Sequence, residues 1–191
     1  MKIEKYKGPV NKIVNDATKI ASDAFRRRMS AGEVKEHLKG GLLYLLLDSG
    51  EMKGFALFED LGDILYLKGI AVEEDYQQHD FFYNVISREL PKYAYFSLRT
   101  QSPVMYNATK NLVKRGLLKG VYPPGGESVL EILLKVKKHL GMNGYSFISR
   151  RFYGGPLYGK EYAYKGKLID EFIPDFNSSN GDAVILIGAV R

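Results

Sequence analysis

Helical and strand-like hydrophobic patterns follow one another along this chain in the order α-α-β-β-β-α-β-α-β, which few folds can accommodate. Apolar residues recur at three- and four-residue steps over residues 11–25, which predicts an amphipathic helix. A second helix is predicted over residues 31–38, with Ser30 as its N-cap and Gly40 and Gly41 as its end. The chain is therefore expected to begin with a pair of helices.

Three runs of strand-forming residues follow the two helices. They cover residues 42–47, 54–58 and 64–72, and turn-forming residues separate them. Short turns between consecutive strands favour antiparallel pairing. The sequence therefore predicts an antiparallel meander after the helical pair.

Helical and strand-like segments alternate after the meander. A helix is predicted over residues 79–90, beginning at residue 79 or 80, and Pro91 breaks it. A strand over residues 93–98 comes next, and a helix over residues 104–115 follows, with Gly116 just past its end.

The last part of the chain carries weaker patterns. Residues 127–136 fit a helix and a strand equally well. The segment 139–191 is rich in glycine and tyrosine, and it predicts a hairpin around residues 162–172, a turn at residues 177–181 and a strong final strand over residues 183–190. Because such a strand needs partners, we expect the tail to pack on the main sheet.

These patterns together predict an α/β (α+β) fold. We expect a mixed, mostly antiparallel central sheet flanked by helices. Residues 1–138 are expected to form the main domain, and residues 139–191 a β-rich extension packed on that same domain.

The composition is that of a folded chain of about one domain. The sequence has 191 residues, of which 45% are hydrophobic and 26% charged. It has no cysteine and three scattered histidines, so we expect no disulfide, no thiolate nucleophile and no metal site. The longest apolar runs, residues 41–47 and 183–190, are far shorter than the roughly 20 residues of a membrane span, and we expect a cytoplasmic location without membrane binding.

The formal net charge of +6 is unevenly distributed. Residues 41–90 carry ten acidic and three basic side chains, whereas residues 91–140 carry two acidic and nine basic ones. Basic segments attract the phosphates of nucleic acids or of nucleotide cofactors, but they serve equally as a solvated surface. No nucleic-acid-binding motif accompanies them, so the sequence allows nucleic acid as a partner without favouring it.

One strand of the meander ends in Ile70, Ala71 and Val72, and an acidic loop and a helix follow it. Together with the order of the elements, this arrangement resembles the GNAT superfamily of N-acetyltransferases over residues 1–138. The resemblance implies acetyl-CoA, or another CoA thioester, as the cofactor. In that family a Gln/Arg-x-x-Gly-x-Gly/Ala motif binds the CoA pyrophosphate through backbone N–H groups at the start of the helix.

The positions that match this motif depart from it in two places. They are Gln77, Gln78, His79, Asp80, Phe81 and Phe82. Gln77 fits the first position, but Asp80 replaces the glycine and Phe82 replaces the small residue. Two interpretations stay open: the loop shifts and still binds a CoA-like ligand, or the fold is kept while the site is lost or serves another ligand. Asp80 can also be an N-cap, and the phenylalanines can be core residues.

The resemblance also suggests where catalytic groups would lie. The family's general acid is a tyrosine four residues before the glycine that closes the later helix, and Leu112 occupies that position before Gly116. Tyr106 is the nearest substitute and Glu59 a candidate general base, although Tyr106 suits packing and Glu59 an exposed turn. Further cofactor contacts are expected where a strand meets the next helix, at Arg99, Thr100, Gln101 and Asn107.

The resemblance implies transfer of an acyl group from a CoA thioester to the amine of a small molecule or protein. The amine would attack the thioester directly while backbone N–H groups near Ile70 and Val72 stabilise the oxyanion. Because this mechanism needs no covalent intermediate, it is compatible with a chain without cysteine. The alternative is an inactive or repurposed domain that binds a nucleotide, nucleic acid or protein partner. The tail could cover the cleft, complete it or form a homodimer contact.

Overall fold

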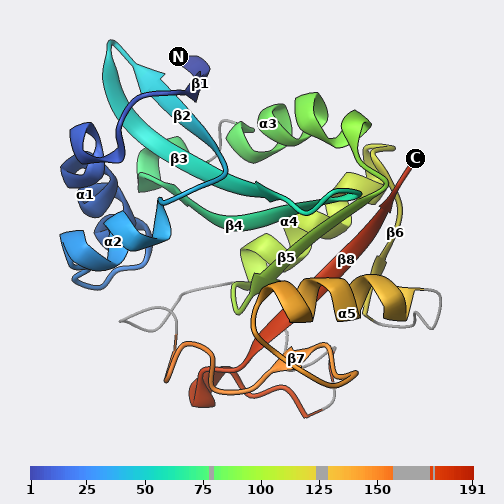
Figure 1. The fold of residues 1–191 in the computed structure, drawn as a ribbon. Helices are drawn as coiled ribbons and strands as arrows, with labels where there is room; N and C mark the ends of the chain where they lie inside the picture. The colour runs from blue at the N-terminus through green and yellow to red at the C-terminus, as the bar shows by residue number, and fades with distance from the viewer. Residues whose placement is uncertain (78–79, 124–128, 157–172, 174) are drawn as a thin grey trace.

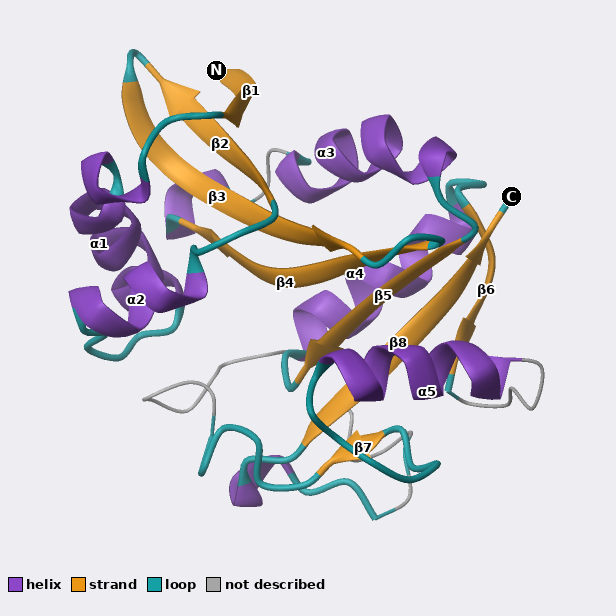
Figure 2. Cartoon of the chain, viewed as in Figure 1, coloured by secondary structure: helices purple, strands orange, loops and turns teal. Residues whose placement is uncertain are grey.

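The computed structural model describes residues 1–77, 80–123, 129–156, 173 and 175–191. The hairpin predicted around residues 162–172 lies outside these described residues. A single sheet crosses the molecule, with the strand order β1-β2-β3-β4-β5-β8-β6 and with β7 paired to β8 (Figures 1 and 2). The strands are β1 (Lys2–Tyr6), β2 (Leu42–Asp48), β3 (Glu51–Asp60), β4 (Ile64–Val72), β5 (Tyr95–Thr100), β6 (Leu118–Tyr122), β7 (Ile148–Ser149) and β8 (Ala183–Val190).

The pairing is mixed and mostly antiparallel, as the sequence predicts. The described strand pairs are antiparallel except for β4 and β5, which run parallel. Strands β2, β3 and β4 form the predicted meander, because two short turns connect them.

Five α-helices flank the sheet in the described part of the chain. They are α1 (Val14–Ala24), α2 (Ala31–His37), α3 (Phe81–Glu89), α4 (Pro103–Lys114) and α5 (Leu130–His139). Helix α2 begins with a capping box, in which Ser30 Oγ accepts from the backbone N–H of Glu33 at 3.2 Å and the Glu33 carboxylate accepts from the backbone N–H of Ser30 at 2.9 Å. The ambiguous segment 127–136 contributes to helix α5, and the four other predicted helices are confirmed within a few residues.

The helices divide between the two faces of the sheet (Figure 1). Helices α3 and α4 bury their apolar sides on one face, in a core that includes Phe58, Phe96 and Leu186. On the other face, α1 and α2 pack near β2 and β3, and α5 packs over β4 and β8, where it contacts Ile185 and Ile187. Neighbouring residues of β8 thus belong to opposite cores, as the alternation of a strand requires.

The final strand lies inside the sheet. Strand β8 pairs with β5 from Tyr95 to Thr100 and with β6 on its other side, so the apolar run of residues 183–190 has the partners that it was expected to need. The boundary near residue 138 stays a prediction, although strands from both sides of it share this sheet.

Strands β1 and β6 and the two-residue strand β7 were not predicted. Strands β1 and β6 lie at opposite ends of the main strand order and have five residues each. Three of the five residues of β1 are charged, and Gly120 interrupts β6. Edge strands are often short and polar, so their hydrophobic signal is weak.

Candidate functional site

Strands β4 and β5 separate halfway along their length. Their pairing extends from Ile64 and Tyr95 to Leu67 and Leu98, after which β4 continues beside β3, and β5 continues beside β8. The separation begins at a β-bulge, because Leu57 pairs with Gly69 and Phe58 with Leu67, which leaves Lys68 without an opposite residue. A bulge bends a strand and increases its twist, so it can direct β4 away from β5.

The separated part of β4 turns backbone groups toward the opening. The backbone N–H of Glu73 donates to the carbonyl of Lys53 at 3.0 Å, so Glu73 faces β3. Since hydrogen-bonding directions alternate along an antiparallel strand, the N–H groups of Ile70 and Val72 face away from β3, toward the opening. The side chain of Gln77 donates to the carbonyl of Val72 at 3.2 Å, which confirms the direction of that carbonyl.

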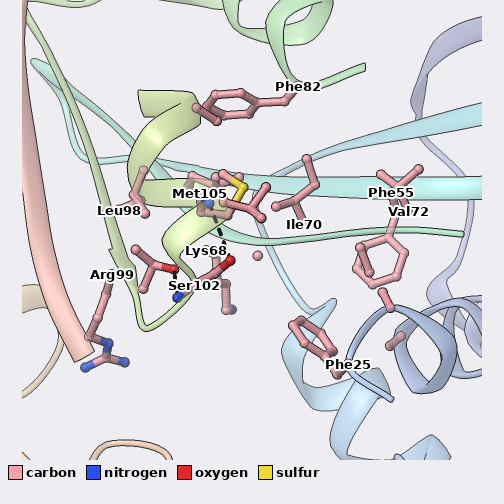
Figure 3. Close-up of a pocket in the computed structure, with 18 of the residues that line it drawn as sticks. Phe25, Phe55, Lys68, Ile70, Val72, Phe82, Leu98, Arg99, Ser102 and Met105 are labelled. Carbon is pink, nitrogen blue, oxygen red and sulfur yellow. Dashed lines mark hydrogen bonds between the residues drawn. The ribbon is translucent and has the colours of Figure 1, made fainter. Parts of the chain in front are cut away.

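A cavity of about 940 Å³ occupies this opening (Figure 3). Its lining comes from both faces of the sheet, with Met105 and Leu112 of α4 on one face and Val34 and His37 of α2 on the other. Ten of the predicted site residues line it: Glu59, Ile70, Ala71, Val72, Gln77, Asp80, Phe81, Phe82, Arg99 and Thr100. The structure therefore gathers most of the predicted cofactor contacts around one space.

The two phenylalanines of the altered motif leave this space open. Phe81 is buried in the core under α3, and the ring of Phe82 packs against Phe96 with the ring centroids 6.2 Å apart. Figure 3 shows Phe82 on the α3 side of the cavity, with Ile70 and Val72 across from it. Both phenylalanines therefore pack in the core, which was the alternative to a role in the motif, and they also border the cavity beside Val72.

Asp80, which stands where the motif has a glycine, has a backbone conformation that glycine readily adopts. Its φ of 52° lies in the left-handed region, which aspartate tolerates better than most residues. Asp80 is the N-cap residue of α3, but its side chain makes no capping hydrogen bond and accepts from Arg115 Nη2 at 3.0 Å. The Arg115 guanidinium also lies over the ring of Tyr83, 4.0 Å from its centroid. A cation from the end of α4 therefore neutralises the carboxylate at the start of α3.

Three of the predicted site residues that the structure describes do not line the cavity: Tyr106, Gln101 and Asn107. Gln78 and His79 lie outside the described residues. Tyr106 is 1% exposed and belongs to the core between α4 and the sheet. The amide of Gln101 donates to the carbonyls of Ser178 and Asp182, and Asn107 donates to the carbonyl of Pro103 in the first turn of α4. Leu112, at the position of the family's tyrosine, does line the cavity.

A group of polar residues borders the cavity on the face of α2 and α5. Glu59 Oε1 lies 2.9 Å from Lys68 Nζ, and Glu59 Oε2 lies 2.6 Å from His139 Nε2. The ring of His37 packs against Gly69, where any Cβ would overlap it. Glu59 was predicted from the sequence, whereas Lys68, His37 and His139 were not, because no local pattern links residues so far apart in the chain.

Electrostatics set the protonation of two of these groups. Burial raises the pKa of Glu59, but hydrogen bonds from Lys68 and His139 outweigh burial and hold the pKa below its usual value. The side chain of His37 is exposed to solvent. The surrounding protein nevertheless desolvates the ring, which disfavours the protonated form, and the positive charge of Lys68 disfavours it further. The pKa of His37 therefore lies below its usual 6.5. At neutral pH the site presents an ionised Glu59 and an uncharged His37.

Two further properties of the described residues bear on the type of site. Among the residues that the structure describes, no helix has the length and the apolar composition that a membrane span requires. Across the part of the chain that the structure describes, no three His, Cys, Asp or Glu side chains are grouped as metal ligands would be.

The fold is that of the GNAT acetyltransferases. IAA acetyltransferase from Bacillus cereus matches with a TM-score of 0.54 at 14% identity, over 99% of both chains. A GNAT family acetyltransferase from Elizabethkingia anophelis with acetyl-CoA bound matches with a TM-score of 0.53 at 15% identity, over 99% of this chain and 97% of that one. An acetyltransferase from Bacillus subtilis in complex with CoA gives 0.53 at 14% identity, over 100% and 99%. The sequence itself matches no known protein family and no curated protein.

Proposed function

We propose that this protein transfers an acyl group, most simply acetyl, from a CoA thioester to an amine. The observation that carries the proposal is the cavity between the separated ends of β4 and β5, toward which the N–H groups of Ile70 and Val72 point. Two of the structures of similar fold contain acetyl-CoA or CoA. An opening in a sheet that exposes backbone donors can bind the amide-rich arm of such a cofactor.

The cofactor would enter from the face of α3 and α4. Its pyrophosphate would lie at the N-terminus of α3, where backbone N–H groups and the helix dipole favour an anion. Arg115 supports this placement, because it adds a cation at this end of α3 and neutralises Asp80. The arm of the cofactor would then pass along β4 and bring the thioester carbonyl to the N–H groups of Ile70 and Val72.

The amine would approach from the opposite face, where the polar residues Glu59, Lys68, His37 and His139 lie. We propose the uncharged imidazole of His37 as the general base, because it can accept a proton while the carboxylate of Glu59 already accepts from Lys68 and His139. The amine nitrogen bonds to the thioester carbon and its proton passes to His37. As the carbon–sulfur bond breaks, the departing thiolate takes a proton from the imidazolium or from water.

One observation favours a second candidate function. Leu112 lines the cavity at the position where the family has the tyrosine that acts as general acid. Tyr106, the nearest substitute, lies in the core. A domain that binds a CoA-like nucleotide without transferring an acyl group would need no such acid. This candidate shares the cofactor site with the first but not the chemistry.

A titration followed by an assay separates the candidates. Acetyl-CoA at about a hundredfold excess over its dissociation constant should stabilise the protein by about 2.7 kcal/mol, which raises the melting temperature measurably. Release of free CoA thiol is then followed with a panel of amines. Stabilisation with thiol release supports acyl transfer, and stabilisation without release for any amine supports the binding domain. The absence of stabilisation would contradict both.

A further inference from the structure

Arg99 stands on the acceptor side of the cavity. It follows Leu98, whose side chain lies in the core under α3 and α4, so strand alternation places Arg99 on the opposite face, with α5. Figure 3 shows its side chain directed away from Phe82 and the α3 side. It lines the cavity together with Tyr66, Phe152 and Tyr153.

The guanidinium of Arg99 has aromatic and sulfur neighbours instead of a carboxylate. It lies over the ring of Phe152, 3.3 Å from the centroid, and its Nη1 contacts Met142 Sδ at 3.4 Å. Its Nε is buried and has no hydrogen-bond partner in the described structure. No carboxylate among the described residues forms an ion pair with Arg99, whereas Arg115 is paired with Asp80.

The other charges of the cavity lining compensate one another. Lys68 pairs with Glu59, Arg115 pairs with Asp80, and the charge of Arg27 acts on the carboxylate of Glu33. Among the described charged residues that line the cavity, Arg99 therefore differs from the others, because no opposite charge lies beside it. A half-buried guanidinium stays protonated and offers planar paired donors, an arrangement that suits a carboxylate or a phosphate in bidentate contact.

We propose that the acyl acceptor is an anionic amine whose carboxylate or phosphate binds Arg99 while its amino group reaches the thioester at β4. This inference rests on the proposed acyl transfer and adds the chemical class of the acceptor. The ring of Phe152 covers one face of the guanidinium, so the anion would contact the nitrogen atoms at its edge. An amine without an anionic group would leave this cation unpaired and should bind more weakly.

The test uses pairs of amines that differ only in the anionic group. Phenylalanine is compared with phenethylamine, and O-phosphoethanolamine with ethanolamine, so that the two arms separate carboxylate from phosphate. Binding to the full chain is measured by calorimetry in the presence of CoA, and turnover with acetyl-CoA by thiol release. We expect the anionic member of one pair to bind roughly tenfold more tightly or better.

Variants assign that preference to Arg99. R99Q should abolish the preference by weakening binding of the anionic member or raising its KM, R99K should keep part of it, and R88Q, on the exposed side of α3, should keep all of it. Acetyl-CoA affinity and melting temperature should be unchanged in R99Q. The inference is overturned if the anionic members bind no better than their partners or if R99Q retains the preference. It is also overturned if R99Q weakens the binding of acetyl-CoA and not that of the anionic amine.

The outcomes also distinguish this inference from the proposed function. Loss of acetyl-CoA binding by the wild-type protein would contradict the proposed acyl transfer, whatever the amines do. Normal acetyl-CoA binding with no preference for anionic amines would contradict only the role of Arg99. If no amine of the panel is acetylated, the proposed acyl transfer is contradicted, and calorimetry then decides only whether Arg99 binds the anionic group.

Discussion

Arg115 Nη2, at the end of α4, lies 3.0 Å from Oδ1 of Asp80, the N-cap residue of α3. Where the family motif has a glycine, this chain combines a carboxylate, a left-handed backbone and a nearby cation. The charge that would repel a pyrophosphate is thereby compensated, and the backbone keeps a conformation that glycine readily adopts. The departure from the motif is therefore smaller in three dimensions than it is in the sequence.

Arg115→Ala should weaken acetyl-CoA binding by about tenfold, because it removes a phosphate-binding cation and leaves Asp80 uncompensated. Calorimetric titration of the purified variant measures the change. Lys114→Ala is the matched control, since Lys114 is exposed on the neighbouring position and does not line the cavity. Equal affinities for both variants and the wild type would remove Arg115 from the cofactor site.

Asp80→Gly should strengthen acetyl-CoA binding by about threefold or more, because it removes a negative charge beside the pyrophosphate. Its effect on stability should stay small. Relief of the left-handed conformation gains about 1 kcal/mol, and loss of an exposed ion pair costs about 0–1 kcal/mol. Melting curves with and without acetyl-CoA test both statements. Weaker binding by the glycine variant would instead indicate that Asp80 contacts the cofactor.

The rate of acyl transfer should fall as the pH is lowered through the pKa of His37. The base must be uncharged, and since the pKa of His37 is below 6.5, activity should persist at pH 6.5 and be lost only at lower pH. His37→Gln should reduce kcat and leave acetyl-CoA affinity unchanged. Glu36→Gln, which alters an exposed neighbour on α2, serves as the control. An unchanged pH profile in His37→Gln would assign the base to another group.

Asp182→Asn should destabilise the fold by about 2 kcal/mol at pH 7, since the carboxylate is 2% exposed. It accepts from Arg150 Nη1 at 2.7 Å and from the backbone N–H groups of Arg151 and Asn177 at 3.0 and 3.3 Å. Burial raises the pKa of Asp182, but these hydrogen bonds outweigh burial and lower it. A lowered pKa means that the stabilisation is complete above the usual value of 3.8 and is lost as the pH falls through the folded-state pKa.

Urea unfolding of wild type and Asp182→Asn at several pH values tests this. The difference in the free energy of unfolding should be constant near neutral pH and should shrink below pH 3.8. Asp175→Asn, at an exposed residue nearby, should change little at any pH. A difference that persists unchanged in acid would exclude the ionised carboxylate as its cause.

The strand end at Arg99, Thr100 and Gln101 was predicted from the sequence only in part. Its position beside the cofactor cleft was expected from the order of the elements, and Arg99 and Thr100 do line the cavity. Gln101 instead connects the start of α4 to the turn before β8. The same residue types can bind a ligand or a distant backbone, and only the position of residues 178–182 decides between them.

The helices and the meander were determined by the sequence alone, because each is encoded in hydrophobic periodicity, caps and turns within about fifteen residues. The position of β8 between β5 and β6, the separation of β4 from β5 and the contact of Glu59 with His139, 80 residues away, were decided by tertiary structure. Pairing between distant segments depends on which apolar faces are buried together, and it leaves no local pattern in either segment.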